Sequence, residues 1–262
     1  MRFYLGTHMP HWLGLTDVPL FVSRRTLCRR KSLPRALGPW ALDSGGFSEL
    51  SMYGEWRTTA EQYVAEVRRY RDEIGNLEWA AIQDWMCEPF ITAKTMPGVP
   101  HRMVVRWHQV FTVLSLRQLR DMAPDLPWAP VVQGWEERDY VDHVAMYAAE
   151  GFDLTTEPIV GVGSVCRRQG THEAERIFRR LHGMGLRIHG FGVKTTGLAR
   201  YHDALGSSDS LAWSFGARYE PPLPGHTHKS CANCLEYALL WRDRVLAGME
   251  RDQLNLLTWR AA

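Results

Sequence analysis

Short apolar runs alternate along the whole chain with longer segments in which apolar residues recur at the spacing of a helix. The apolar runs are bounded by Gly, Pro, Asp or Ser, as strands commonly are. We therefore expect about eight strands, at residues 2–6, 19–22, 40–43, 79–84, 129–133, 159–163, 188–193 and 210–215.

The helical pattern is clearest in four of the intervening segments, residues 58–74, 102–122, 137–150 and 171–184. Thr58-Thr59-Ala60-Glu61 resembles a capping box at the start of the first of them. Regular alternation of strands and helices indicates a parallel sheet wrapped by helices. Eight such units in about 250 residues predict an α/β fold of the (β/α)8 TIM barrel type.

Polar residues and glycines stand where the predicted strands end. Barrels of this kind carry their chemistry at the carboxyl ends of the strands, so these residues are candidates for one shared site. They are Asp43 and Ser44, Gln83 and Asp84, Gln133 and Gly134, the stretch 161–164, and Lys194 and Thr195. For any single Asp or Gln, capping of the next helix is the alternative.

Asp43-Ser44-Gly45-Gly46-Phe47 is the most informative of these strand ends. It combines a carboxylate, a hydroxyl and two residues without side chains, which leaves room for a flat ligand against the backbone. Asp, Ser and Gly are also common turn residues, so a purely structural turn is the alternative.

A cluster of possible metal ligands lies near the C-terminus, with His226, His228, Cys231 and Cys234 inside nine residues. Two imidazoles and two thiolates can close a tetrahedral Zn²⁺ site and leave no position for water, which indicates a structural metal. The 5 cysteines of the chain do not form a disulfide framework, so reduced thiols are expected. A polar loop with incidental cysteines is the alternative.

The chain has 262 residues, of which 45% are hydrophobic and 23% charged, so it can bury the core of one large domain. We expect residues 1–220 to form the barrel, and residues 221–262 to form a zinc-binding segment and a barrel-closing helix of the same domain. No apolar run approaches the roughly 20 residues of a membrane span, and the N-terminus lacks a signal-peptide pattern. A cytoplasmic location without a membrane partner is therefore expected.

The formal net charge of +2 does not by itself indicate a nucleic-acid partner. Its distribution is more informative, because basic residues crowd one short segment that contains Arg24, Arg25, Arg29, Arg30, Lys31 and Arg35. Such clusters bind phosphates, and we take the first five residues as candidate nucleic-acid contacts. A solvated loop or helix face is the alternative.

Four motifs follow one another along the chain: Asp43-Ser44-Gly45-Gly46-Phe47, Asp84-Trp85-Met86-Cys87-Glu88-Pro89, Val132-Gln133-Gly134 and Gly161-Val162-Gly163. The ordered set resembles the tRNA-guanine transglycosylase superfamily, including its DNA-acting branch, the deazaguanine DNA transglycosylases associated with phages and genomic islands. The family's counterparts are Asp-Ser-Gly-Gly-Phe, a base-recognising Asp-Glu-Cys-Thr-Pro, Val-Gln-Gly and a glycine-rich strand end. The resemblance covers roughly residues 40–240.

The resemblance implies exchange of a base at a nucleoside. In the family an Asp attacks the anomeric carbon, guanine leaves, and a 7-deazaguanine base then displaces the enzyme. Asp209, which follows the seventh predicted strand as that nucleophile does, is the implied nucleophile, and Asp43 is the implied general acid and base. A carboxylate suits the first role because it stabilises an oxocarbenium-like centre before bonding to it. Helix capping is the alternative for Asp209.

The resemblance also implies the residues that hold the base. Asp84 and Gln133 would hydrogen-bond the purine edge, and the set is completed by Ser44, Gly134, Gly161 and Gly163. A buried carboxylate that receives two N–H donors selects guanine-like bases, because a base without those donors leaves it unpaired.

The family has three cysteines in the place of the C-terminal cluster and a histidine well downstream. This chain departs from that pattern, because His226 and His228 replace cysteines, Cys234 is additional, and no histidine follows residue 228. The departure affects the implied ligand set and not the location of the zinc site.

The chain is short for the tRNA enzymes and lacks an appended RNA-binding domain after the zinc segment, which favours DNA as the substrate. A compact barrel with one basic segment suits a base extruded from the duplex. The expected incoming base is a 7-deazaguanine such as 7-cyano-7-deazaguanine. The alternatives are an enzyme that reads a tRNA stem-loop, an inactive nucleic-acid-binding member, and a glycosidase that hydrolyses the nucleoside.

Overall fold

The computed structural model describes residues 1–260 of the chain. Its sheet has nine strands in the order β5-β4-β3-β2-β1-β9-β8-β7-β6, and neighbouring strands are parallel. The strands are β1 (Arg2–Thr7), β2 (Leu20–Ser23), β3 (Trp40–Asp43), β4 (Leu77–Ala81), β5 (Trp128–Ala129), β6 (Val131–Val132), β7 (Val160–Val162), β8 (Ile188–Gly190) and β9 (Ser207–Ser210).

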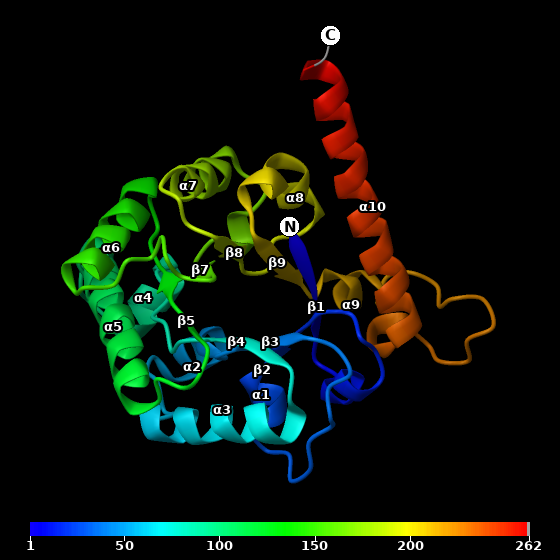
Figure 1. Cartoon of the computed structure of the whole chain (residues 1–262), viewed down its shortest axis with the longest axis horizontal. Coiled ribbons are helices and arrows are strands. Elements are labelled where there is room, and N and C mark those ends of the chain that lie inside the picture. The colour runs from blue at the N-terminus through cyan, green and yellow to red at the C-terminus, as the bar shows by residue number, and fades with distance from the viewer. Residues whose placement is uncertain (261–262) are drawn as a thin grey trace.

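The two ends of this sheet belong to one continuous stretch of chain. β5 and β6 are separated by Pro130 alone, which has no N–H to donate to a strand ladder. β5 pairs with β4 and β6 with β7, and the Pro130 carbonyl accepts the Gly161 N–H at 2.8 Å. With β5 and β6 counted as one strand, the sheet forms the eight-stranded parallel barrel that the sequence predicts (Figure 1).

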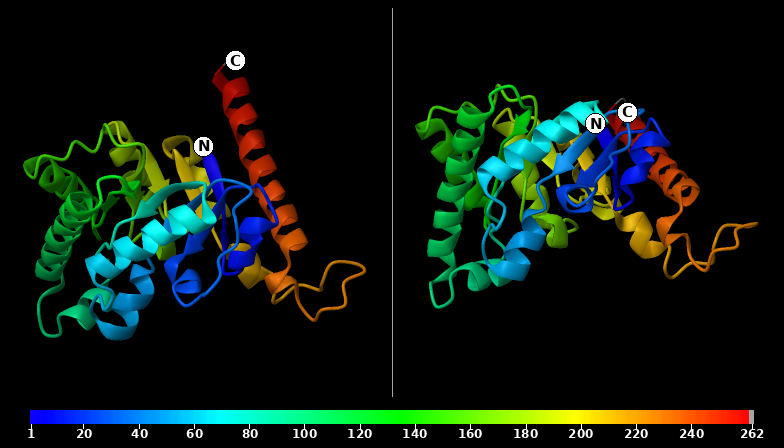
Figure 2. Two further views of the ribbon diagram at one scale, coloured as in Figure 1. Left: turned by 60° about the horizontal axis from the view of Figure 1, so that its bottom comes forward. Right: turned by 90° about the horizontal axis from the view of Figure 1, so that it is seen from below.

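Helices surround the barrel (Figures 1 and 2). They are α1 (Arg24–Leu27), α2 (Gly46–Tyr53), α3 (Ala60–Ile74), α4 (Pro89–Thr95), α5 (His101–Met122), α6 (Glu137–Ala149), α7 (His172–Gly183), α8 (Thr195–Tyr201), α9 (Ala212–Gly216) and α10 (Leu235–Arg260). The four helices with the clearest sequence pattern, α3, α5, α6 and α7, begin and end within two residues of the predicted bounds. The capping box of α3 joins Thr59 to Gln62, one residue later than the predicted pair.

Aromatic side chains from several strands fill the barrel interior. The ring of Trp79 on β4 lies 5.9 Å from that of Tyr4 on β1 and 4.7 Å from that of His189 on β8. Phe21 on β2 completes this layer, 5.3 Å from His189. On the other face of β1, Phe3 contacts Trp241 of α10 at a ring distance of 6.0 Å. Because these large rings interlock, the interior layer is rigid. It supports the carboxyl ends of the strands.

The strand predicted at residues 210–215 is wrong. The last strand, β9, is the polar sequence Ser207–Ser210, and the apolar residues that follow form the helix α9. The polar strand is stable in place because its backbone pairs with β1 and β8, so tertiary context outweighs strand propensity. In α9, Trp213 is buried and its indole N–H donates to the Gly6 carbonyl at 2.8 Å.

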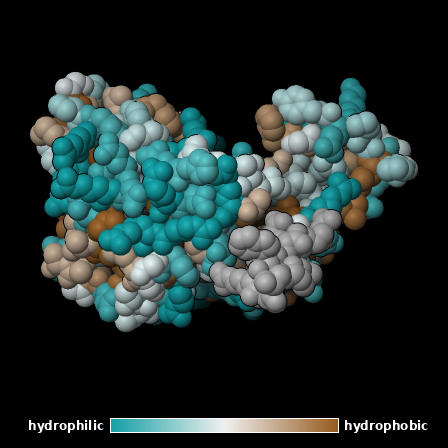
Figure 3. Space-filling model, turned by 90° about the horizontal axis from the view of Figure 1, so that it is seen from above, coloured by the Kyte–Doolittle hydropathy of each residue, from teal (hydrophilic) through white to brown (hydrophobic). Residues whose placement is uncertain are grey.

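The chain between α9 and α10 projects from the barrel as a loop (Figures 1 and 2). The space-filling view shows this arm standing away from a largely hydrophilic surface (Figure 3). Helix α10 then packs against β1, α8 and α9. The last two residues of the predicted segment 221–262 lie outside the described residues. Over the part of the chain that is described, no helix is both long and apolar enough to cross a bilayer.

Candidate functional site

A cavity of about 340 Å³ opens at the carboxyl ends of the strands. Its walls include Asp43, Asp84, Gly163 and Asp209, which come from four different strand ends. Phe21, from the aromatic layer inside the barrel, also lines it. The volume is in the range of small-molecule sites, and the position is where barrels of this type hold substrates.

Asp43 ends β3, and the chain turns directly into α2 through Gly45. Gly45 has φ +81°, a left-handed conformation that favours glycine. The Asp43 carboxyl accepts hydrogen bonds from the Ser23 side chain and the Gly45 backbone, which lower its pKa. Burial acts more strongly and, with the nearby charge of Asp209, raises the pKa of Asp43 above its ordinary value.

Asp209 lies inside β9, opposite Tyr4 of β1, and not at the cap of a helix, which was the alternative. Its Oδ1 accepts the Gly192 N–H at 2.9 Å and lies 3.3 Å from His189 Nε2. The other nitrogen of His189 is 2.8 Å from Ser207 Oγ, which fixes the orientation of the ring. Both contacts involve Oδ1 of Asp209, so Oδ2 takes part in neither of them.

Asp84 and Gln133 contact each other inside the cavity wall. The Gln133 side-chain amide donates to Asp84 Oδ2, and Ser44 Oγ lies 3.4 Å from Asp84 Oδ1. Burial is the main cause that raises the pKa of Asp84 to about 7, against the lowering effect of the Gln133 hydrogen bond. The sequence prediction that these three residues share a site agrees with this geometry.

The three predicted glycines serve mainly to make room. A Cβ on Gly163 would lie 2.1 Å from Gln133 Nε2, so only glycine lets that amide reach Asp84. The Gly163 N–H already donates to the Val132 carbonyl at 3.0 Å. A Cβ on Gly134 would lie 2.8 Å from the Asp139 side chain, and one on Gly161 would lie 2.5 Å from Phe191. Gly134 and Gly161 therefore pack behind the cavity.

Several cavity residues had no specific role predicted from the sequence. Glu88, Ser164 and Arg167 line the cavity, and the Arg167 guanidinium lies 4.5 Å from the Phe90 ring centre and 5.1 Å from that of Phe47. Ser164 belongs to the strand end 161–164 that the strand-end rule identified as a candidate, without a role of its own. His189 gave a weaker signal, since one histidine between apolar residues is more often a core residue.

Comparison with family models gives a match to DpdA, described as "DeoxyPurine in DNA protein A", over residues 1–262. The chain belongs to the DpdA family. This family is the DNA-guanine transglycosylase branch of the tRNA-guanine transglycosylase superfamily, so the protein is a pentosyltransferase that modifies DNA. A search of curated proteins found no match to the chain.

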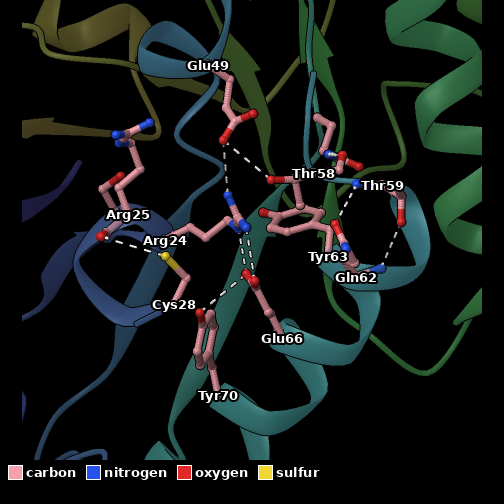
Figure 4. Close-up of polar contacts among 12 residues, drawn as sticks. Arg24, Arg25, Cys28, Glu49, Thr58, Thr59, Gln62, Tyr63, Glu66 and Tyr70 are labelled. Atoms are coloured by element: carbon pink, nitrogen blue, oxygen red, sulfur yellow. Dashed lines mark hydrogen bonds and ion pairs between the residues drawn. The ribbon is translucent and has the colours of Figure 1, made fainter. Parts of the chain in front are cut away.

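The basic segment of this DpdA family member has two parts with different environments, and Figure 4 shows the part around Arg24 and its acidic partners. Arg24 is buried, and its guanidinium donates to Glu66 at 2.9 Å and lies 3.5 Å from Glu49. These ion pairs join α1 to α2 and α3. They also occupy the Arg24 guanidinium, which is the group that would otherwise bind a phosphate. Arg25 is half-buried, whereas Arg29, Arg30 and Lys31 are exposed and thus accessible to a ligand.

We expect Arg24→Ala to lower the free energy of unfolding by about 3 kcal/mol, because it leaves Glu49 and Glu66 without their buried partner. Arg30→Ala is the matched control, and it should change stability by less than about 0.5 kcal/mol, since its side chain is exposed. Urea denaturation measures both. Equal stability of the two variants would contradict the structural role of Arg24.

The predicted metal ligands converge. One donor atom from each of His226, His228, Cys231 and Cys234 lies within 4.8 Å of the others. His228 Nε2 lies 3.3 Å from His226 Nδ1 and 3.1 Å from Cys231 Sγ, and Cys234 Sγ lies 3.7 Å from His226 Nδ1. The edges of a zinc tetrahedron with these ligands measure about 3.3 to 3.8 Å. Two of the three separations fall in this range, and the cluster could hold a Zn²⁺ ion.

The surroundings of the cluster also suit a metal. His226 Nε2, on the far side of the ring from the cluster, is 3.1 Å from a carboxylate oxygen of Glu236. The Leu223 N–H points to Cys231 Sγ at 3.4 Å. Carboxylates that orient a ligand histidine and N–H groups that stabilise a thiolate are usual partners of zinc sites. The four residues can hold a metal whose role would be to join the projecting loop to the start of α10.

Metal analysis should find about one zinc per chain, since the cluster supplies one set of four ligands. Replacement of Cys231 and Cys234 by Ser should abolish binding, because two neutral hydroxyls do not replace two thiolates. Cys28→Ser, at a half-buried cysteine outside the cluster, is the control and should retain the metal. Stoichiometric zinc in the double variant would exclude this cluster as the site.

Proposed function

We propose that the cavity exchanges guanine in DNA for a 7-deazaguanine base, such as 7-cyano-7-deazaguanine, through a covalent bond between Asp209 and the sugar. The observation that carries the proposal is that Asp43 and Asp209 line the same cavity as Asp84. Two carboxyl groups for the chemistry and one for the base are what an exchange reaction requires. Membership of the DpdA family supports the reaction class.

Asp209 is the proposed nucleophile. Donors on Oδ1 hold the carboxylate in position, and a carboxylate can stabilise positive charge at the anomeric carbon before it forms the bond. The bond from the sugar to guanine breaks as the bond to Asp209 forms. Attack of the incoming base on the same carbon then releases Asp209, so the sugar keeps its original configuration.

Asp43 is the proposed proton carrier. A raised pKa keeps its carboxyl neutral to higher pH than an ordinary Asp, which allows it to protonate the departing guanine. The ionised carboxyl can then accept a proton from the incoming base. Its neighbour Asp209 assists the first step, because a second negative charge nearby favours the neutral form of Asp43.

Base recognition falls to Asp84, Gln133 and Ser44 in this proposal. Ionised Asp84 accepts two N–H donors from the Watson–Crick edge of guanine, and these donors are present in guanine and in 7-deazaguanines alike. Because the pKa of Asp84 is raised to about 7, binding of the base should weaken as the pH falls through that value. Gly134, Gly161 and Gly163 provide space for the residues that touch the base.

DNA would reach the cavity with its target base rotated out of the duplex, as enzymes that act on bases in DNA require. The mouth carries Arg167 between Phe47 and Phe90, which suits stacking against a base or a contact to its phosphate. Arg25, Arg29, Arg30 and Lys31 would contact more distant phosphates. Arg24 supports these side chains from within the fold.

Asp209→Ala should abolish incorporation of labelled guanine or 7-cyano-7-deazaguanine into duplex DNA, because no covalent intermediate can form. In the wild-type protein, denaturation during incubation with DNA alone should trap an adduct, and peptide mass spectrometry should locate it on Asp209. An adduct on Asp43 would reverse the two roles. Exchange at full rate in Asp209→Ala would end the nucleophile assignment.

Asp43→Asn should slow exchange about 100-fold or more, which is the usual contribution of general acid–base catalysis. Asp121→Asn, at an exposed position on α5, is the matched control and should keep the wild-type rate. Single-turnover exchange with labelled base measures both. A wild-type rate in Asp43→Asn would remove Asp43 from the proton transfer.

A further inference from the structure

A buried chain of hydrogen bonds joins Glu88 to Asp84 through Ser164 and Gln133. Ser164 Oγ lies 2.8 Å from Glu88 Oε2 and 2.7 Å from Gln133 Oε1. The Gln133 amide nitrogen then donates to Asp84 Oδ2. Glu88 is 5% exposed and Asp84 8% exposed, so the polar atoms of this chain depend mainly on one another for hydrogen-bond partners.

The number of protons in this chain can be counted. The Cys87 backbone N–H donates to Ser164 Oγ at 2.8 Å, so the hydroxyl has one lone pair and one proton left. Two oxygens face it, and the hydroxyl proton can serve only one of them. Gln133 Oε1 is a carbonyl oxygen and has no proton to give. With the Gln133 amide in this orientation, both contacts of Ser164 are therefore satisfied only if Glu88 is the donor to Ser164.

The opposite direction of the chain is also self-consistent, but it requires a different arrangement. Ser164 would donate to ionised Glu88, the Gln133 amide would be turned over, and Asp84 would need the proton in order to donate to Gln133. Either way, one proton is held at one end of the chain. In the structure the Gln133 amide nitrogen faces Asp84, which corresponds to the arrangement in which Asp84 is ionised.

We propose that Glu88 holds this proton as a neutral acid, and that it thereby keeps Asp84 ionised and its amide partner Gln133 correctly oriented for base recognition. Glu88 acts through Ser164 and Gln133, so it is a positioning residue. Its role in selecting a base rests on the proposed function, whereas its protonation state does not.

The charges around Glu88 are consistent with a neutral acid. Burial is the largest effect on the pKa of Glu88 and raises it, whereas Arg167 and Arg168 lower it. Arg168 is already engaged, 3.0 Å from Glu173, and Arg167 is exposed and stacked on aromatic rings. On the other side of the chain, an ionised Glu88 would add its repulsion to that of Asp43 and raise the pKa of Asp84. A neutral Glu88 removes one of these repulsions.

The protonation state can be read in the resting protein by infrared difference spectroscopy. The spectrum of the wild-type protein minus that of Glu88→Gln, at neutral pH, should show the C=O band of a protonated carboxylic acid. Glu55→Gln, at an exposed glutamate, should remove only a carboxylate band. Loss of a carboxylate band and not of an acid band in Glu88→Gln would overturn the proposal.

Guanine affinity against pH, measured by equilibrium dialysis, tests the consequence for the base. Wild-type affinity should fall as the pH drops through about 7, where Asp84 takes up a proton. In Glu88→Gln this fall in affinity, which is the acid limb of the pH profile, should stay at the same pH. The neutral amide of Gln replaces the neutral acid as the donor to Ser164, so the charge near Asp84 does not change. If Glu88 were ionised, removal of its charge would lower the pKa of Asp84 and move the limb by about one pH unit or more, which would refute the proposal.

Ser164→Ala is a second variant that tests the proposal, because it removes the hydroxyl between Glu88 and Gln133. Loss of the donor to the Gln133 carbonyl should weaken guanine binding about tenfold, by the usual cost of one unpaired buried group. Unchanged affinity would show that the chain does not orient Gln133. If no guanine binding is found in any variant, the proposed function fails, while the infrared experiment still decides the state of Glu88.

Discussion

The site depends on the cost of burying four acidic side chains, Asp43, Asp84, Glu88 and Asp209, around one cavity. An unpaired buried carboxylate is expensive, and several in one place repel one another. The fold meets this cost with neutral donors: Gly192 N–H for Asp209, the Ser23 hydroxyl and the Gly45 N–H for Asp43, and the Gln133 amide for Asp84. With neutral donors, one acid can be protonated while another is ionised. A salt bridge would prevent this, because a cationic partner favours the ionised form of the acid.

Closure of the barrel makes these donors available at the right place. Pro130 divides one strand into β5, which pairs with β4, and β6, which pairs with β7. Gln133 follows β6 directly, and its own backbone is held by His143 and by Gln109, each at 2.8 Å. Burial lowers the pKa of His143 to about 3, so its ring is neutral and can accept the Gln133 N–H. The amide that is proposed to recognise the base is thus mounted on a rigid part of the sheet.

The sequence predicted the barrel, the four long helices and the strand-end residues Asp43, Asp84 and Gln133, because hydrophobic period and strand-end position are local features. It did not predict that Arg24 is buried, since its partners Glu49 and Glu66 are distant in sequence and nothing in a basic run reveals them. The roles of Glu88, Ser164 and His189 were missed for a similar reason. Their function depends on proton and hydrogen-bond partners that only the folded chain brings together.

The error in the last strand has a physical meaning for the chemistry. A sequence of Ser, Ser, Asp and Ser has poor strand propensity, yet it pairs on both sides with β1 and β8. A loop would have accommodated these polar residues more easily than a strand does. It would, however, have allowed the Asp209 carboxylate to move. A nucleophile must be held close to its target for fast reaction, so the position of the proposed nucleophile Asp209 within a strand exchanges local propensity for fixed geometry. Residues that contradict their local sequence signal are therefore good candidates for function in a barrel of this kind.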